Sequence, residues 1–134
     1  MNDHRIAAIQ SAYEAFGRGD VDAVMTDFAD DILWEAVPSS TAAPWYGVYR
    51  GKAEVPRFFK EIISSVEVTE FAPMTFTAND TEVIAVVRWG FRVPSTGTQV
   101  VTDIVHLFRF TDDKLTYVRT WEDTAEAARA FATS

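Results

Sequence analysis

The sequence contains no cysteine at all. This absence excludes disulfides, thiolate zinc sites and cysteine nucleophiles. The chain also has no uninterrupted apolar run near the roughly 20 residues that a membrane-spanning helix needs. No apolar segment typical of a signal peptide follows its polar first residues, Met1 to Arg5. We therefore expect a cytoplasmic protein that does not enter a membrane.

Basic side chains are also scarce. Twenty Asp and Glu residues stand against twelve Lys and Arg residues, which gives a formal charge of -8. An excess of negative charge opposes binding to phosphate backbones and to anionic lipid surfaces. Neither nucleic acid nor a membrane is therefore an expected partner.

Large apolar side chains, by contrast, are abundant. The 134 residues are 48% hydrophobic and 13% aromatic. A domain of this size buries roughly two-thirds of the surface that its unfolded chain exposes, so a single core is possible. We predict one domain over residues 1–134 that requires neither a structural metal nor a cofactor.

Three amphipathic helical patterns occupy the first half of the chain. Gly17 and Gly19 end the first pattern, Asp20 is suited to cap the second, and the third is expected to start near Lys52. The apolar residues share one face of each helix, and they are Ile6, Ile9, Tyr13 and Phe16, then Val21, Val24, Met25 and Phe28, then Val55, Phe58, Phe59, Ile62 and Ile63.

The second half of the chain reads as a succession of long β-strands joined by short turns. A short strand from Ile32 to Val37 and a loop from Val37 to Tyr49 come before it, and a short helix ending at Phe131 follows it. Helices followed by an antiparallel meander predict an α+β fold whose curved sheet wraps around the helices and leaves a pocket. The four predicted strands are Ser65 to Thr77, Thr81 to Val93, Gln99 to Phe110 and Leu115 to Trp121.

Several short segments in this order resemble the nuclear transport factor 2-like superfamily, most closely its SnoaL-like and ketosteroid isomerase-related members. These segments are Gly19-Asp20, Phe28-Ala29-Asp30-Asp31, Tyr49-Arg50-Gly51, His106-Leu107-Phe108-Arg109-Phe110 and Arg119-Thr120-Trp121-Glu122-Asp123. The resemblance covers nearly the whole chain and implies a cone-shaped, mostly antiparallel sheet wrapped around three N-terminal helices. It leaves the reaction open, because this fold hosts isomerases, cyclases, hydrolases, dehydratases and binding modules.

The ketosteroid isomerase site carries over to this sequence only in part. Tyr13 lies near the position of the tyrosine that forms the oxyanion hole in those enzymes, and His106 takes the place of the aspartic acid beside it. Ala36 replaces the aspartate that moves the proton. The resemblance therefore does not imply ketosteroid isomerase activity.

The limonene epoxide hydrolase site is also incomplete. Trp34 and Ala36 replace the tyrosine and asparagine that hold the water in those enzymes. The two catalytic aspartates fall near Arg88 and Thr120. The resemblance does not imply this activity either.

Strand alternation predicts which side chains line the pocket. If His106 faces inward, Phe108 and Ile104 share its face, because successive residues of a strand point to opposite sides. Tyr13 and Trp34 complete an aromatic cavity suited to a small hydrophobic molecule with one or two oxygen atoms, and Phe59 is placed with them as a substrate contact. The inward residues predicted on the two neighbouring strands are Val86, Arg88 and Gly90, and Val118, Thr120 and Glu122.

The leading hypothesis is cofactor-independent acid–base catalysis on a hydrophobic carbonyl or cyclic compound. His106 would carry the proton, while Tyr13 and Arg88 would donate hydrogen bonds to a developing oxyanion. Arg88 could instead form a buried ion pair with Glu122. A binding protein without chemistry, and a dimeric structural module, remain as alternatives.

The opposite face of the sheet is predicted to form a homodimer interface. Exposed aromatic and aliphatic side chains on one face are costly to leave in water, and two-fold pairing is the commonest form of oligomer. Alternation assigns to this face Trp89, Val105, Leu107, Arg119 and Trp121.

Overall fold

The computed structural model describes residues 3–132, and within them the chain forms four helices and one six-stranded sheet. Three of the helices begin after an aspartate whose side chain accepts a backbone N–H of the first turn, namely Asp3, Asp20 and Asp123. The helices are α1 (His4–Gly17), α2 (Val21–Val24), α3 (Gly51–Ser65) and α4 (Thr124–Phe131).

The strands pair in the order β2-β1-β6-β5-β4-β3. Neighbours are antiparallel except β1 and β6, which run parallel, so the sheet is mixed. It is open, because β2 and β3 are its two edges. The strands are β1 (Phe28–Ala36), β2 (Gly47–Arg50), β3 (Glu67–Ala78), β4 (Glu82–Arg92), β5 (Gln99–Thr111) and β6 (Lys114–Trp121).

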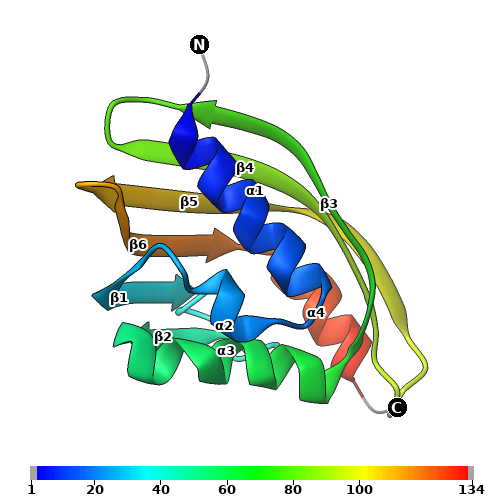
Figure 1. Cartoon of the computed structure of the whole chain (residues 1–134). Helices are drawn as coiled ribbons and strands as arrows, with labels where there is room; N and C mark the ends of the chain where they lie inside the picture. The colour runs from blue at the N-terminus through cyan, green and yellow to red at the C-terminus, as the bar shows by residue number, and fades with distance from the viewer. Residues whose placement is uncertain (1–2, 133–134) are drawn as a thin grey trace.

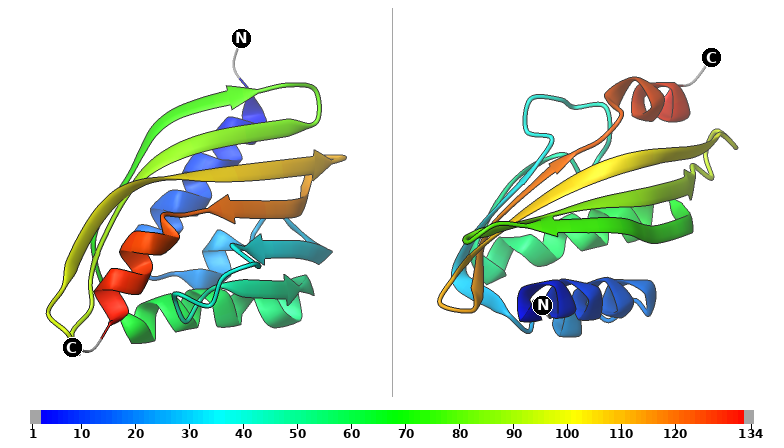
Figure 2. Two further views of the ribbon diagram at one scale, coloured as in Figure 1. Left: turned by 180° about the vertical axis from the view of Figure 1, so that it is seen from behind. Right: turned by 90° about the horizontal axis from the view of Figure 1, so that it is seen from above.

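The sheet curves around the N-terminal helices. Figure 1 shows β3, β4 and β5 bending past α1, with α3 lying along β1 and β2. In Figure 2, α4 follows directly from β6 and lies on the other side of the strands from α1. The predicted α+β fold, with a strongly curved and mostly antiparallel sheet around three helices, is therefore confirmed. None of the helices within residues 3–132 is long and apolar enough to span a bilayer.

Two elements differ from the sequence prediction. The second helix stops at Val24, and Phe28 starts β1 instead of completing a helical stripe. The segment expected to be a loop up to Tyr49 contains edge strand β2, which pairs with the end of β1. Both differences arise because pairing with neighbouring strands supplies backbone hydrogen bonds that local sequence patterns do not reveal.

The predicted faces of β4 are wrong by one residue. Val87 and Trp89 point into the core, where they are 0% and 3% exposed, whereas Arg88 lies between them on the outer face. Register explains the difference: Ala85 lies opposite His106, and Arg88 lies opposite Asp103. Because directly opposed residues share a face, the residues that flank Ala85 point away from His106.

Candidate functional site

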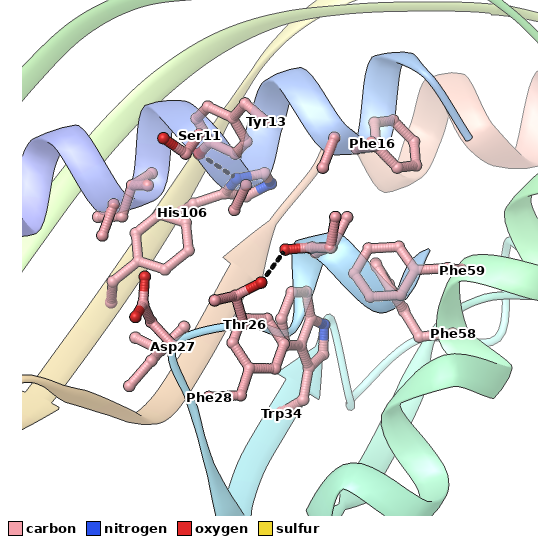
Figure 3. A pocket seen from close by; sticks show the side chains of 18 of the residues that line it. Ser11, Tyr13, Phe16, Thr26, Asp27, Phe28, Trp34, Phe58, Phe59 and His106 are labelled. Atoms are coloured by element: carbon pink, nitrogen blue, oxygen red, sulfur yellow. Dashed lines mark hydrogen bonds between the residues drawn. The ribbon is translucent and has the colours of Figure 1, made fainter. Parts of the chain in front are cut away.

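A cavity of about 370 Å³ lies between the N-terminal helices and the concave face of the sheet. Small residues on the helices, including Ala8, Ala12 and Ala23, leave space that the surrounding rings enclose. Figure 3 shows these side chains converging from α1, α3 and the sheet. The aromatic lining residues are Tyr13, Phe16, Phe28, Trp34, Phe58, Phe59, Phe71, Trp89, Phe108 and Phe110.

Tyr13 and His106 form a hydrogen-bonded pair on one wall of this cavity. The Tyr13 hydroxyl oxygen lies 2.7 Å from Nδ1 of His106, which links α1 to the middle of β5 (Figure 3). Phe71 packs edge-on against the tyrosine ring, and Phe108 packs edge-on against the imidazole. The pair therefore has a fixed orientation within an apolar surround.

Burial changes the proton affinity of both members of the pair. Removal from water raises the pKa of Tyr13 above its usual value of 10, so its hydroxyl keeps its proton. The same desolvation lowers the pKa of His106 from 6.5 to about 4. The imidazole is therefore neutral at physiological pH, and the surface that it retains faces the cavity.

Glu122 is the acidic group of the cavity. It follows β6, and burial raises the pKa of its carboxyl from 4.5 to about 7. The indole N–H of Trp45 donates to both carboxylate oxygens, at 3.2 and 3.4 Å, and opposes this rise. The nearby Tyr46 hydroxyl acts in the same direction as the indole, although it makes no regular hydrogen bond.

Strand pairing places His106 and Glu122 near each other. His106 lies opposite Thr120 across β5 and β6, and Glu122 follows the end of β6 two residues after Thr120. Both side chains line the same cavity. A small molecule in the cavity could therefore contact both side chains at once.

Four polar residues of the cavity, from α1 and from the segment after α2, were not anticipated from the sequence. Ser11 and Arg18 come from α1 or its end, and Thr26 and Asp27 come from the segment between α2 and β1. Figure 3 shows Ser11, Thr26 and Asp27 around the cavity, with the Thr26 hydroxyl donating to a backbone oxygen. Only their position in the sequence could have indicated that these residues line the cavity, because the turn after α2 must pass the end of α1.

The structure brings together most, but not all, of the predicted site residues. Thr120 is fully buried and is not among the residues that line the cavity. The predicted placement of Arg88 is wrong: its side chain is 45% exposed and pairs with Asp103 at 3.3 Å, not with Glu122. The predicted residues that line the cavity are Tyr13, Trp34, Phe59, His106, Phe108 and Glu122.

Metal ligands do not cluster in the described part of the chain. No group of three or more His, Asp or Glu side chains within residues 3–132 is arranged to hold a metal ion. The Tyr13–His106 pair and Glu122 lie instead among aromatic and aliphatic side chains of the cavity wall. This arrangement suits proton transfer and hydrogen bonding in an apolar environment.

A helix-covered, curved sheet that encloses an apolar cavity defines the nuclear transport factor 2-like class of proteins. Residues 9–118 match the family model described as the SnoaL-like domain. Because this match spans most of the 134 residues, the chain belongs to the SnoaL-like domain family.

Solved structures support the same class. An NTF2-like protein of unknown function from Burkholderia pseudomallei is 22% identical, with a TM-score of 0.89 over 98% of this chain and 100% of that one. An NTF2-like protein from Burkholderia xenovorans is 27% identical, with a TM-score of 0.83 over 96% and 95%. TerC, co-crystallized with polyporic acid, is 20% identical, with a TM-score of 0.86 over 96% and 98%. The comparison with curated proteins gave no match.

Proposed function

We propose that this protein binds a small hydrophobic carbonyl or cyclic molecule in the cavity and catalyses a cofactor-independent proton transfer on it. The observation that carries the proposal is the position of Glu122, whose pKa of about 7 results from burial in an aromatic cavity. An acid–base group is most effective when its pKa lies near the working pH. Glu122 meets this condition.

In this proposal Glu122 carries the proton, whereas the sequence alone had suggested His106 for that role. A buried imidazole with a pKa of about 4 is a weak base at neutral pH. As a neutral group bonded to Tyr13, it is suited instead to hydrogen bonding. In this proposal the Tyr13–His106 pair donates a hydrogen bond to the substrate oxygen as negative charge develops there.

The proposed proton transfer needs no reactant other than the substrate and the Glu122 side chain. The Glu122 carboxylate accepts a proton from the carbon beside the carbonyl, and the electron pair of that C–H bond moves toward the carbonyl oxygen. The protonated carboxyl then returns the proton to the same carbon or to another carbon of the enolate. Isomerisation and ring closure both begin with this step.

Known structures of the same fold favour this choice over a purely structural role. TerC was co-crystallized with polyporic acid, and a related structure contains trimethylamine, so small molecules occur in crystals of proteins with this architecture. Other structural neighbours carry names of candidate isomerases or polyketide cyclases. Their identities with this chain are 12–22%, so these names support a reaction class and not a substrate.

Solvent deuterium exchange tests the proposal. Indanone and tetralone, two enolisable ketones, are incubated with the protein in heavy water, and loss of the proton beside the carbonyl is followed by NMR. We expect exchange by the wild type and a loss of roughly 10²–10⁴-fold in Glu122→Gln, the usual range for an acid–base group. His106→Asn should slow exchange less.

Binding is measured on the same proteins by thermal shift. A ketone that stabilises both wild type and Glu122→Gln, but is exchanged only by the wild type, supports catalysis. Binding without exchange in the wild type, across the ketone panel, would instead identify a binding protein without chemistry.

A further inference from the structure

The Trp45 side chain contacts the proposed proton carrier from outside the cavity. Its indole N–H reaches both oxygens of Glu122, yet Trp45 is not among the described residues that line the cavity wall. The contact therefore leaves the cavity side of the carboxylate free for a ligand. An N–H donor held in this way stabilises the ionised carboxylate over the protonated form.

The segment that carries Trp45 is fixed at both ends. At its start, Val37 donates its backbone N–H to Thr120 of β6 and adopts a φ of 40°, which is a strained conformation for a β-branched residue. At its end, the Tyr49 hydroxyl donates to the backbone oxygen of Trp45 at 2.9 Å. Local sequence preference alone would not produce this conformation.

The indole ring is also held on its faces and edges. Trp45 is 0% exposed, and it packs edge-on against Trp89, Phe91 and Phe131. These contacts come from β4 and α4, two elements distant in sequence from the loop. A side chain restrained by two separate elements presents its N–H in one direction.

We propose that Trp45 is a positioning residue that holds the Glu122 carboxylate toward the cavity and stabilises its ionised form through the indole hydrogen bond. The inference rests on the proposed role of Glu122 as the proton carrier. The ionisable residues that line the cavity with Glu122 are Tyr13, Arg18, Asp27 and His106, and Tyr46 lies beside the carboxyl. The pKa of Glu122 is shifted by burial, by the Trp45 indole and by the Tyr46 hydroxyl, and Arg18 is not among these causes. The indole donor is therefore the main group that favours the carboxylate.

The direct test is the titration of Glu122 in the Trp45→Phe variant. Carboxyl-selective ¹³C NMR follows the titration, and Glu122→Gln identifies the signal. Loss of the indole donor should raise the pKa of Glu122 by on the order of 1 pH unit, from about 7. The acid limb of the exchange-rate profile should move upward by the same amount.

Trp89→Phe is the matched control. Trp89 is equally buried, packs against Trp45 and lines the cavity, but its indole N–H has no partner among the described residues. The change removes a similar amount of packing without removing a hydrogen bond to Glu122. Equal shifts of the Glu122 titration in both variants, or no shift in either, would overturn the proposal.

A measurement on the wild type covers the case in which Trp45→Phe does not fold. The indole ¹⁵N–¹H signal of Trp45 should move downfield as Glu122 ionises, with the same midpoint, and this movement should vanish in Glu122→Gln. A Trp45 signal that does not respond to pH near the Glu122 midpoint would refute the contact. Because neither titration requires turnover, a protein without exchange activity could still pass this test, and an active one could fail it.

Discussion

Glu122 and His106 respond to the same cavity in opposite ways. Each side chain loses water on folding, and desolvation disfavours whichever form carries charge. The acid therefore becomes harder to ionise and the base harder to protonate, with pKa values of about 7 and about 4. Between these values the cavity holds two neutral groups, which suits an apolar ligand.

This symmetry predicts a characteristic dependence of stability on pH. Between pH 4.5 and 7, Glu122 is protonated in the native state but ionised in the unfolded state, so its contribution to the free energy of unfolding falls as pH rises. Between pH 4 and 6.5, His106 is neutral in the native state but protonated in the unfolded state, so its contribution rises. Each change in pKa corresponds to on the order of 3 kcal/mol.

Urea unfolding from pH 4 to 8 checks the two contributions separately. Relative to the wild type, Glu122→Gln should gain stability with rising pH because it lacks the loss caused by Glu122. His106→Asn should lose stability relative to the wild type as pH rises, because it lacks the gain caused by His106. The free energy of unfolding of the wild type should vary least between pH 4.5 and 6.5, where the two contributions oppose each other. Difference curves that are flat with pH would show that the two side chains are solvated.

Residue-level prediction succeeded on β5 and failed on β4. On β5, the condition that His106 faces inward placed Ile104 and Phe108 on the same face, and all three residues line the cavity. On β4, the run from Val83 to Val87 is apolar throughout, so pattern alone could not decide its face. The charge pairing of Arg88 with Asp103 across the strands would have supplied the missing register.

At the scale of the element, close packing between β3 and β4 depends on Gly90. A Cβ atom at this position would lie 2.9 Å from the hydroxyl of Thr69 and 3.1 Å from Cβ of Glu70, beside an irregularity in the β3–β4 register. We expect Gly90→Ala to destabilise the protein by roughly 1–3 kcal/mol, because the strands must separate locally. Chemical unfolding measures this loss.

Gly17→Ala is the control for that substitution. Gly17 is the last residue of α1, and an added Cβ would meet nothing within 4 Å. Alanine there should stabilise the helix by up to about 1 kcal/mol. A Gly90→Ala variant as stable as Gly17→Ala would show that β3 and β4 are not tightly packed at this point.

The elements themselves were predicted with uneven success. Long periodic segments such as α1 and β5 were recognised because their own sequence fixes their type. Strand β2 was missed because its four residues carry no pattern, and they form a strand only by pairing with β1. The contact of Trp45 with Glu122 was missed for a related reason, since nothing in an irregular loop indicates what it will cover.

At the scale of the whole molecule, the outer face of the sheet predicts a homodimer. Trp89 must be removed from the predicted interface, because it is buried on the inner face. Large apolar side chains remain there, with Trp121 45% exposed beneath the guanidinium of Arg119 and Val101 53% exposed. Two such faces packed about a two-fold axis would remove these side chains from water.

Light scattering at micromolar concentration checks the assembly. The wild type should have a mass near twice 15.0 kDa. Trp121→Glu should approach the mass of one chain, whereas a change at an exposed position outside the sheet, such as Lys60→Gln on α3, should leave the dimer intact. A monomeric wild type would refute the interface.

The parallel pairing of β1 with β6 has a consequence for how the chain folds. These strands are neighbours in the sheet but lie on either side of α3 and three long strands in sequence. Pairing across such a separation is entropically costly and slows folding. During synthesis, β3, β4 and β5 can pair with one another as they emerge. In contrast, α1, β1 and β2 can join this sheet only after β6 has been made, because β1 pairs with β6. The cavity, whose walls come from both groups, therefore becomes available to a ligand only in the last stage of folding.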